Sequence, residues 1–216
     1  DSMPLIQFTD SKGRKSWSEA THQISMHKLQ MIDTVINATS VPTNILESGG
    51  TVSFKITKND IIVQGCTLEI NVVESGASNP VKPTIAPLII GSIEWWANGG
   101  GQKIMTTHGE QLLFDIGMAL DDGDLDSASR VLNMNSHFQQ PRDIPAGGSA
   151  RYYIPIVSSP LSSRRGIYLG NLSGDLICRI HFVASKESGT GTLAVNNNDM
   201  HLHLHTLELP EDDIED

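Results

Sequence analysis

The chain has 216 residues and a formal net charge of -10, from 15 Lys and Arg against 25 Asp and Glu. That length is enough for one domain with a full hydrophobic core. The acidic balance argues against direct binding to nucleic acid, because a phosphate backbone repels a surface without a basic patch. The N-terminal residues do not look like a signal peptide, and no run of 18 apolar residues occurs, so we expect no membrane span.

Residues 1 to 44 are expected to form an N-terminal arm followed by a lead-in strand or helix. The apolar residues from Trp17 to Met31 fit both helical and alternating spacing. A strand after about Thr21 is favoured, because the β-branched residues that follow are poor helix formers.

Two half-buried strands are predicted next. The segment from Val52 to Ile56 alternates apolar and polar residues, and a longer alternation runs from Ile61 to Val73. In the longer strand, Cys66 and the apolar residues in phase with it should face the core, whereas Thr67 and Glu69 should face water.

The stretch from Leu88 to Leu120 has the most distinct pattern in the chain. It begins as an alternating strand, and the Asn and Gly residues from Asn98 to Gly101 predict a tight turn, because they accept positive φ angles. A second strand, Gln102 to Thr106, should then pair antiparallel with the first. Thr107 and Glu110 have capping-box spacing and precede apolar residues at helical spacing, so an amphipathic helix is expected to follow.

The remainder of the chain contributes three more strands and several polar loops. The patterns place the strands at Ala150 to Ile156, at Leu176 to Phe182 and at His201 to Leu209. Pro155 in the first of these predicts an edge position or a bulge, since proline cannot donate to a strand ladder. A carboxylate-rich break at Asp121 to Asp124 is expected to begin a short second helix.

Together these patterns predict an all-β fold, an eight-stranded antiparallel jelly-roll β-sandwich with short inserted helices. We expect the jelly-roll domain to span residues 45 to 209 and residues 210 to 216 to form an acidic tail or link. Cys66 and Cys178 both lie in apolar strand patterns and are expected to be buried free thiols.

The sharpest candidate for a functional cluster is a run of alternating histidines. A strand would place His201, His203 and His205 on one face, where neighbouring imidazoles can share a metal ion. The spacing from His201 through His203 to Glu208 also resembles the first half of the cupin metal motif. However, Val195 stands where that motif has a glycine, and no second motif follows. An exposed polar strand face is the favoured interpretation, and a cupin-like metalloenzyme is the alternative.

No other pattern points to catalysis. The segment from Gly170 to Gly174 does not have the spacing of a G-x-S-x-G nucleophile elbow. The segment from Gly99 to Gly101 lacks the lysine that follows in a phosphate-binding loop. Neither cysteine has the cationic or helix-start setting that lowers the pKa of a thiol. We therefore predict no catalytic, cofactor-binding or metal-binding residues.

Four features between Val52 and Phe182 form one larger pattern. The first is a short strand, a charged turn and a long strand, TVSFKITKNDIIVQGCTLEINVV, and the second is the strand, glycine turn and strand of SIEWWANGGGQKI. The third is His108-Gly109-Glu110 at the start of the predicted helix. The fourth is ARYYIPIV, followed by a loop with GIYLGNLSG and by DLICRIHF. In these features the chain resembles the first barrel of major capsid proteins of the upright jelly-roll lineage, which includes membrane-containing tailless phages, adenoviruses and large DNA viruses.

The resemblance implies a structural capsid protein and not an enzyme, located in the virion and assembled in the host cytoplasm. Its partners would be further copies of itself, in trimers or pseudo-hexameric capsomers of an icosahedral shell, together with other capsid proteins and an internal viral membrane. No small-molecule substrate, cofactor or direct contact with nucleic acid is implied. Double-barrel members of that lineage contain a second jelly roll, so this chain would be a single-barrel member or part of a longer protein.

Overall fold

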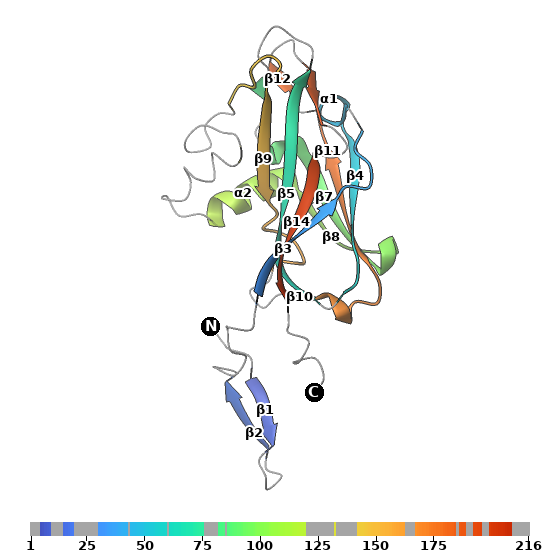
Figure 1. Cartoon of the computed structure of the whole chain (residues 1–216), viewed down its shortest axis with the longest axis vertical. Coiled ribbons are helices and arrows are strands. Elements are labelled where there is room, and N and C mark those ends of the chain that lie inside the picture. The colour runs from blue at the N-terminus through green and yellow to red at the C-terminus, as the bar shows by residue number, and fades with distance from the viewer. Residues whose placement is uncertain are drawn as a thin grey trace.

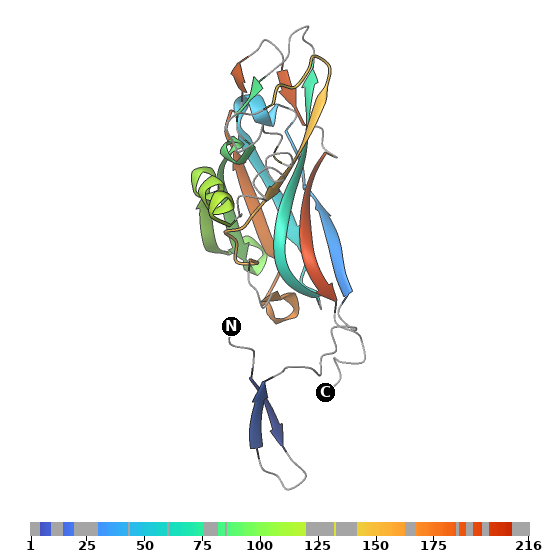
Figure 2. The ribbon, with the colours of Figure 1, turned by 90° about the vertical axis from the view of Figure 1, so that its left-hand side faces the viewer.

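The computed structural model of the chain describes residues 5–9, 15–19, 30–42, 44–59, 61–75, 82–84, 86–119, 132, 142–162, 167–184, 186–188, 192–195 and 199–208. Within these ranges the chain is mainly β-strand, and two antiparallel sheets face each other (Figures 1 and 2).

The larger sheet contains four long strands in the order β3, β14, β5, β9. Their bounds are Gln30–Asn37 for β3, Met200–Glu208 for β14, Ile61–Ser75 for β5 and Ser149–Pro155 for β9. Two short strands, β10 (Ile167–Tyr168) and β13 (Thr192–Ala194), also pair with β5. Among the described strands β9 pairs with β5 alone, which confirms the edge position predicted from Pro155.

The smaller sheet has the order β4, β11, β7, β8. These strands span Gly50–Ile56, Leu176–Phe182, Ile90–Ala97 and Gln102–His108. His181 pairs with Ser92 and Phe182 with Ile90, so Gly91 is an extra, unpaired residue in β7. This bulge changes the phase of the strand, which is why Ile90 and Ile93 are both buried although they are three residues apart.

The chain crosses between the two sheets in the order of a jelly roll. From β3 it passes to β4 in the smaller sheet, returns to β5, makes the β7 and β8 pair, returns to β9, crosses to β11 and ends on β14. The predicted fold class, an eight-stranded antiparallel jelly-roll β-sandwich with short inserted helices, is confirmed. Residues 30–37, which the sequence assigned to the lead-in segment, pair with β14 along all of β3 and are therefore part of the larger sheet.

The core lies between the two sheets and is filled by the apolar members of each alternation. In β5 the predicted inward residues are buried, and β11 alternates buried and half-buried positions from Leu176 to Phe182. The largest fully buried side chains include Trp95, Phe54, Leu68 and Ile93. Burial of each such side chain contributes about 1.5–3 kcal/mol, so this interior supplies most of the drive to fold.

The unit predicted from Leu88 to Leu120 is present as β7, a turn, β8 and helix α2 (Gly109–Ala119). The turn η2 (Asn98–Gly100) has φ angles of 54° at Asn98 and 66° at Gly99, as the Asn and Gly content predicts. The predicted capping box at Thr107 and Glu110 is not formed, however. Thr107 lies within β8, and its buried hydroxyl donates to the carbonyl of Ser158 at 3.0 Å instead of capping α2.

Helix α2 lies on the flank of the sandwich where β8 and β9 end their sheets, and this flank faces the viewer in Figure 2. Leu112 and Ile116 are buried, as predicted for its apolar stripe. A Cβ at Gly109 would lie 1.9 Å from the carbonyl oxygen of Ile90, so only glycine fits where the helix begins against β7.

The remaining described elements are short. They are helix α1 (Ile45–Ser48), the 3-10 turns η1 (Ala86–Ile89) and η4 (Leu169–Asn171), and two separate strand pairs, β6 (Lys82–Pro83) with β12 (Lys186–Ser188) and β1 (Leu5–Thr9) with β2 (Lys15–Glu19). No helix in the described part of the chain is long and apolar enough to cross a membrane. The predicted acidic break at Asp121 to Asp124 and the tail at 210 to 216 lie outside the described residues.

Candidate functional site

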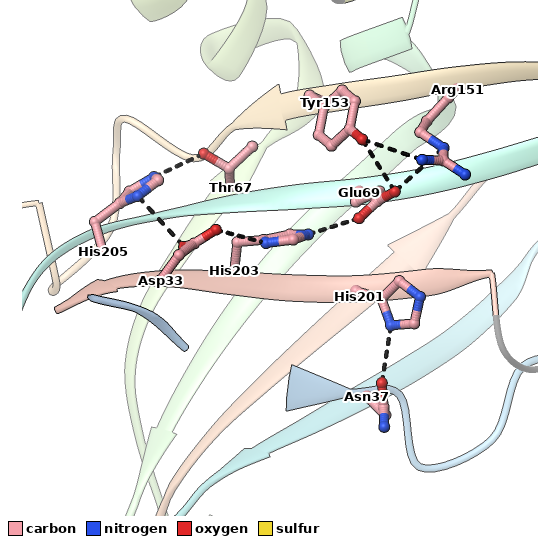
Figure 3. Close-up of polar contacts among 9 residues, drawn as sticks. All are labelled: Asp33, Asn37, Thr67, Glu69, Arg151, Tyr153, His201, His203 and His205. Atoms are coloured by element: carbon pink, nitrogen blue, oxygen red, sulfur yellow. Dashed lines mark hydrogen bonds and ion pairs between the residues drawn. The ribbon is translucent and has the colours of Figure 1, made fainter. Parts of the chain in front are cut away.

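The predicted histidine face lies on the outside of the larger sheet. Leu202 and Leu204 of β14 are 0% and 1% exposed and point into the core. The alternation of a strand therefore places His201, His203 and His205 on the opposite, outer face (Figure 3). The prediction that the three imidazoles share one face is confirmed.

His203 is held between two carboxylates. Its Nε2 lies 2.6 Å from Oε2 of Glu69 on β5, and its Nδ1 lies 3.0 Å from Oδ2 of Asp33 on β3. A carboxylate only accepts hydrogen bonds, and a neutral imidazole has one N–H donor. Both bonds can form together only when the ring is a doubly protonated, positively charged imidazolium.

The contacts of Glu69 extend this arrangement to β9. Its Oε1 accepts a hydrogen bond from the hydroxyl of Tyr153 at 3.2 Å and lies 3.3 Å from Nε of Arg151. Asp33, His203, Glu69, Tyr153 and Arg151 thus form a polar chain across all four long strands, which we call the large-sheet polar chain (Figure 3). Glu69 was expected to face water, but its neighbours leave it only 9% exposed.

The other two imidazoles have separate partners. His201 Nδ1 lies 2.8 Å from Oδ1 of Asn37, the residue directly opposite it on β3. His205 Nε2 lies 3.0 Å from Oγ1 of Thr67, and its Nδ1 lies 3.7 Å from Oδ1 of Asp33. The three rings therefore do not converge on one point.

The pKa values of the central pair move in opposite directions. Burial alone would lower the pKa of His203, but hydrogen bonds to Glu69 and Asp33 outweigh it, and the pKa is raised. Burial alone would raise the pKa of Glu69, but hydrogen bonds from His203 and Tyr153 and the charge of Arg151 outweigh it, and the pKa is lowered. Both directions favour the ion pair.

This geometry does not support the cupin-like alternative. Ligands of a shared metal ion each aim a ring nitrogen at it from about 2.0–2.2 Å, whereas both ring nitrogens of His203 are bonded to carboxylates and Nδ1 of His201 is bonded to Asn37. In the parts of the chain that the structure describes, no group of three or more His, Cys, Asp or Glu residues is arranged to hold a metal ion. The side chain of Glu208, the third residue of that proposal, lies outside the described set.

The two cysteines lie in the core as free thiols, as predicted. Burial raises the pKa of Cys66 to about 12, although a hydrogen bond to Ser159 acts in the other direction. Burial also raises the pKa of Cys178 well above its ordinary value. Because the thiolate is the reactive form, neither residue is suited to nucleophilic catalysis.

The smaller sheet carries a second polar chain on its own outer face. Thr51 of β4 bonds to Nδ1 of His181 at 2.8 Å, Nε2 of His181 lies 3.5 Å from Oε2 of Glu94, and Oε1 of Glu94 accepts a bond from Lys103 Nζ at 2.8 Å. These four residues, the small-sheet polar chain, come from β4, β11, β7 and β8 in turn. The hydrogen bond from Lys103 is the main reason why the pKa of Glu94 is lowered to about 2.

Trp96 packs against the same face of the smaller sheet. Its Nε1 donates to Oε2 of Glu94 at 3.1 Å. The guanidinium of Arg179 lies 4.7 Å from the centre of the indole ring and Lys103 Nζ lies 5.4 Å from it, both within cation–π range. The outer faces of both sheets are thus tied internally by polar and cationic side chains.

The flank formed by α2 is different, because it exposes large apolar side chains. Phe114 is 66% exposed and Met118 is 72% exposed, and Ile104 on the neighbouring strand β8 is 49% exposed. Sequence reasoning identified the buried stripe of α2 but missed these residues. Phe114 and Met118 are four residues apart on α2, out of phase with Leu112 and Ile116. This spacing predicts a second apolar stripe on the helix and could have identified both residues from the sequence.

Comparison with known proteins identifies the fold but no close relative. No protein-family model matches the chain, and no curated protein matches it. Among solved structures it is similar to the PBCV-1 virus capsid quasi-atomic model, with a TM-score of 0.56 and 16% identity over 86% of this chain and 44% of that one.

Two further solved structures show the same likeness. PBCV-1 VP54, fitted into a reconstruction of the virophage Sputnik, has a TM-score of 0.52 and 15% identity, over 86% of this chain and 44% of that one. The mavirus major capsid protein has a TM-score of 0.48 and 12% identity, over 97% of this chain and 52% of that one. The chain spans about half the length of these structures. At such identities the two PBCV-1 structures establish the jelly-roll fold alone.

Proposed function

We propose that this chain is a structural protein of a viral capsid, and that its work is to associate with further copies of itself through the flanks of its jelly roll. The observation that carries the proposal is the strand order, β3-β14-β5-β9 facing β4-β11-β7-β8, together with the fold likeness to the PBCV-1 capsid structures. Fold alone does not determine function, so the surfaces must also be considered.

The surface chemistry supports a structural role. Polar residues on the outer faces form ion pairs within each sheet. His203 pairs with Asp33 and Glu69, and Glu94 pairs with Lys103. Both thiols are buried and protonated at neutral pH. The large exposed apolar residues of α2 are instead the kind of surface that marks protein association.

The finer parts of the proposal concern the assembly. Copies would form trimers or pseudo-hexameric capsomers of an icosahedral shell, in contact with other capsid proteins and with an internal viral membrane. The protein would be assembled in the host cytoplasm and reside in the virion. The division into an N-terminal arm, a jelly-roll domain and an acidic tail remains a prediction, with residues 30–37 counted in the sheet. We propose no catalytic activity, small-molecule substrate or direct contact with nucleic acid.

The test is the copy number of the chain in particles. Particles would be purified by density gradient from cells that carry the gene, and the chain quantified by mass spectrometry against labelled peptides. A capsid protein should be among the most abundant proteins in the particle fraction and resist external protease there. Particles that lack the chain, with the protein confined to the soluble cell fraction, would contradict the proposal. Stoichiometric Zn, Fe or Mn in the purified protein would instead favour the cupin-like alternative.

A further inference from the structure

The outer edge of β3 differs from the edges formed by β4, β8 and β9. Sheet edges are commonly protected from pairing with another chain by proline, by lysine or by a covering element. β9 contains Pro155, β8 contains Lys103 and contacts α2, and the carbonyl of Ser53 on β4 accepts a hydrogen bond from the loop after β3. By contrast β3, the outermost strand of the larger sheet in Figure 2, contains no proline, lysine or arginine, and Asp33 is its one charged residue.

Every second residue of β3 directs its backbone groups toward this edge. The strand pairs in register with β14, and the amide of Ala38 continues the ladder by donating to the carbonyl of Met200 at 3.4 Å. Because the direction of these bonds alternates along an antiparallel strand, the N–H and C=O groups of Asp33, Val35 and Asn37 point away from β14. In the parts of the chain that the structure describes, none of these backbone groups has a hydrogen-bond partner. The edge of β3 is therefore a row of free donors and acceptors.

Val35 adds apolar surface to the same edge. It pairs with His203, so its side chain lies on the outer face of the larger sheet, and it is 51% exposed. The next residue, Ile36, packs against the core on the other face but is only half-buried. An edge that combines free backbone groups with accessible β-branched side chains is the kind that binds a further strand.

The sequence of β3 is complementary to itself when a second copy runs antiparallel. In the register that places Val35 opposite Val35 of the second copy, Asp33 lies opposite Asn37. On the core side Ile36 then lies opposite Thr34. Apolar side chains meet at the two-fold axis, each carboxylate meets an amide that can donate to it, and no like charges are opposed. A register centred on Asp33 would instead oppose two carboxylates, which is destabilising.

We propose that two copies of this chain associate through β3, which pairs antiparallel with β3 of the second copy and joins the two larger sheets into one. This rests on the self-association proposed above and names one contact for it. The contact is isologous, so by itself it stops at two copies. Larger assemblies need a second contact, and the exposed Phe114 and Met118 of α2 lie on the opposite flank, where β8 and β9 end their sheets.

Disulfide formation between copies tests the register. In a hydrogen-bonded antiparallel pair the Cα atoms lie about 5.5 Å apart, within the range that a disulfide spans. Val35→Cys should therefore give a disulfide-linked dimer under mild oxidation, and Cys66 and Cys178 are buried and do not compete. Asn37→Cys is the matched control, because its two copies would lie about 13 Å apart along the edge and should not link. Absence of a Val35→Cys dimer, at concentrations where the unmodified chain associates, would overturn the pairing.

Removal of one edge donor measures the contribution of the backbone bonds. Val35→Pro deletes an N–H that points away from β14, so the ladder within the sheet is kept while the second copy loses a donor. Association should weaken about ten- to hundredfold, as expected when the symmetric pair loses two hydrogen bonds. Val35→Thr keeps the N–H and the branched shape and should change association by less than about threefold. Sedimentation velocity measures both variants, and equal effects of the two would overturn the proposal.

Val35→Lys keeps the test valid if the proline variant does not fold. It retains every backbone group and changes only an exposed side chain, but it opposes two ammonium groups across the two-fold axis. Association should be weaker than in the unmodified chain at low salt and partly restored at high salt, since salt screens exposed charges. The urea unfolding midpoint should stay close to that of the unmodified chain. Unchanged association of Val35→Lys at low salt would contradict the pairing.

The outcomes separate this contact from the wider function. If the unmodified chain associates and is present in particles but the Val35 variants behave as it does, the β3 contact is wrong and the capsid role stands. If Val35→Pro prevents association and Val35→Cys gives no dimer, another segment occupies the edge and the two-fold pairing is wrong. If the unmodified chain remains monomeric and is absent from particles, the capsid role itself fails.

Discussion

The outer faces of the two sheets use the same plan with different chemistry. In each, a polar chain crosses four strands, with a histidine on the second strand and a glutamate on the third: His203 and Glu69 in the larger sheet, His181 and Glu94 in the smaller. The difference lies at the ends. The larger sheet has a carboxylate, Asp33, at the edge next to its histidine, whereas the smaller sheet has the hydroxyl of Thr51 there.

That difference determines which charge holds each sheet. In the larger sheet the central cation is an imidazolium between two carboxylates, and imidazole changes charge near neutral pH. In the smaller sheet Glu94 bonds to a lysine, which stays charged through that range. Two polar chains of similar layout should therefore respond differently to substitution and to pH.

The largest effect is expected from Glu69→Gln. This carboxylate joins β14 to β9 and is 9% exposed, so its removal leaves the His203 cation without its closest partner. We expect the free energy of unfolding to fall by about 2 kcal/mol, in the range measured for hydrogen bonds to charged groups. Urea unfolding monitored by tryptophan fluorescence measures it. No change in the unfolding midpoint would show that the large-sheet polar chain does not stabilise the fold.

A smaller effect is expected from Glu94→Gln. The bond from Lys103 is short, but the Lys103 side chain is 45% exposed, so solvent screens the pair. We expect a loss of about 1 kcal/mol in the same urea experiment. A loss larger than that of Glu69→Gln would reverse the ranking of the two polar chains.

The pH profile should distinguish the sheets at its alkaline end. The pKa of His203 is raised in the folded state, so its stabilisation is complete below the ordinary histidine pKa and is lost as pH rises through the raised value. The urea midpoint should therefore decline as pH rises above the ordinary histidine pKa of about 6.5, by less than Glu69→Gln causes. The decline should be absent in His203→Gln and present in Lys103→Gln. A decline that survives His203→Gln would assign it to another group.

At the acid end both sheets should lose stability. The pKa of Glu94 is lowered to about 2, and that of Glu69 is also lowered. The stabilisation from each carboxylate is complete above its ordinary pKa and is lost as pH falls through the lowered value. Acid denaturation alone therefore does not distinguish the contribution of the large-sheet polar chain from that of the small-sheet polar chain.

The smallest effect is expected from His201→Gln. Among the residues drawn in Figure 3, His201 bonds to Asn37 alone, and it belongs to neither polar chain. We expect a change within about 0.5 kcal/mol. A loss as large as that from Glu69→Gln would mean that the whole histidine face, and not the Asp33, His203 and Glu69 cluster, stabilises the larger sheet.

The sequence predicted the strands well because alternation is a local signal. In β11 every second residue is apolar and faces the core, and in β14 the same pattern holds from Met200 to Leu204. The Asn and Gly turn before β8 was equally legible, since few residues accept positive φ. Local signals failed at Thr107, whose spacing suited a cap but whose hydroxyl bonds to Ser158, 51 residues away.

The surface features depended on strand order, which no local pattern encodes. That Glu69 of β5 would meet His203 follows only once β14 is known to lie between β3 and β5. The histidine face could thus be predicted, but the partners that decide its chemistry could not.

The central claim is that this jelly roll acts by joining copies of itself, and its oligomeric state tests this most directly. Sedimentation velocity of the purified full chain, over a range of micromolar concentrations and near neutral pH, would measure it. We predict a concentration-dependent shift from monomer to a discrete oligomer, trimeric or larger. A single monomeric species across the whole range would contradict the account.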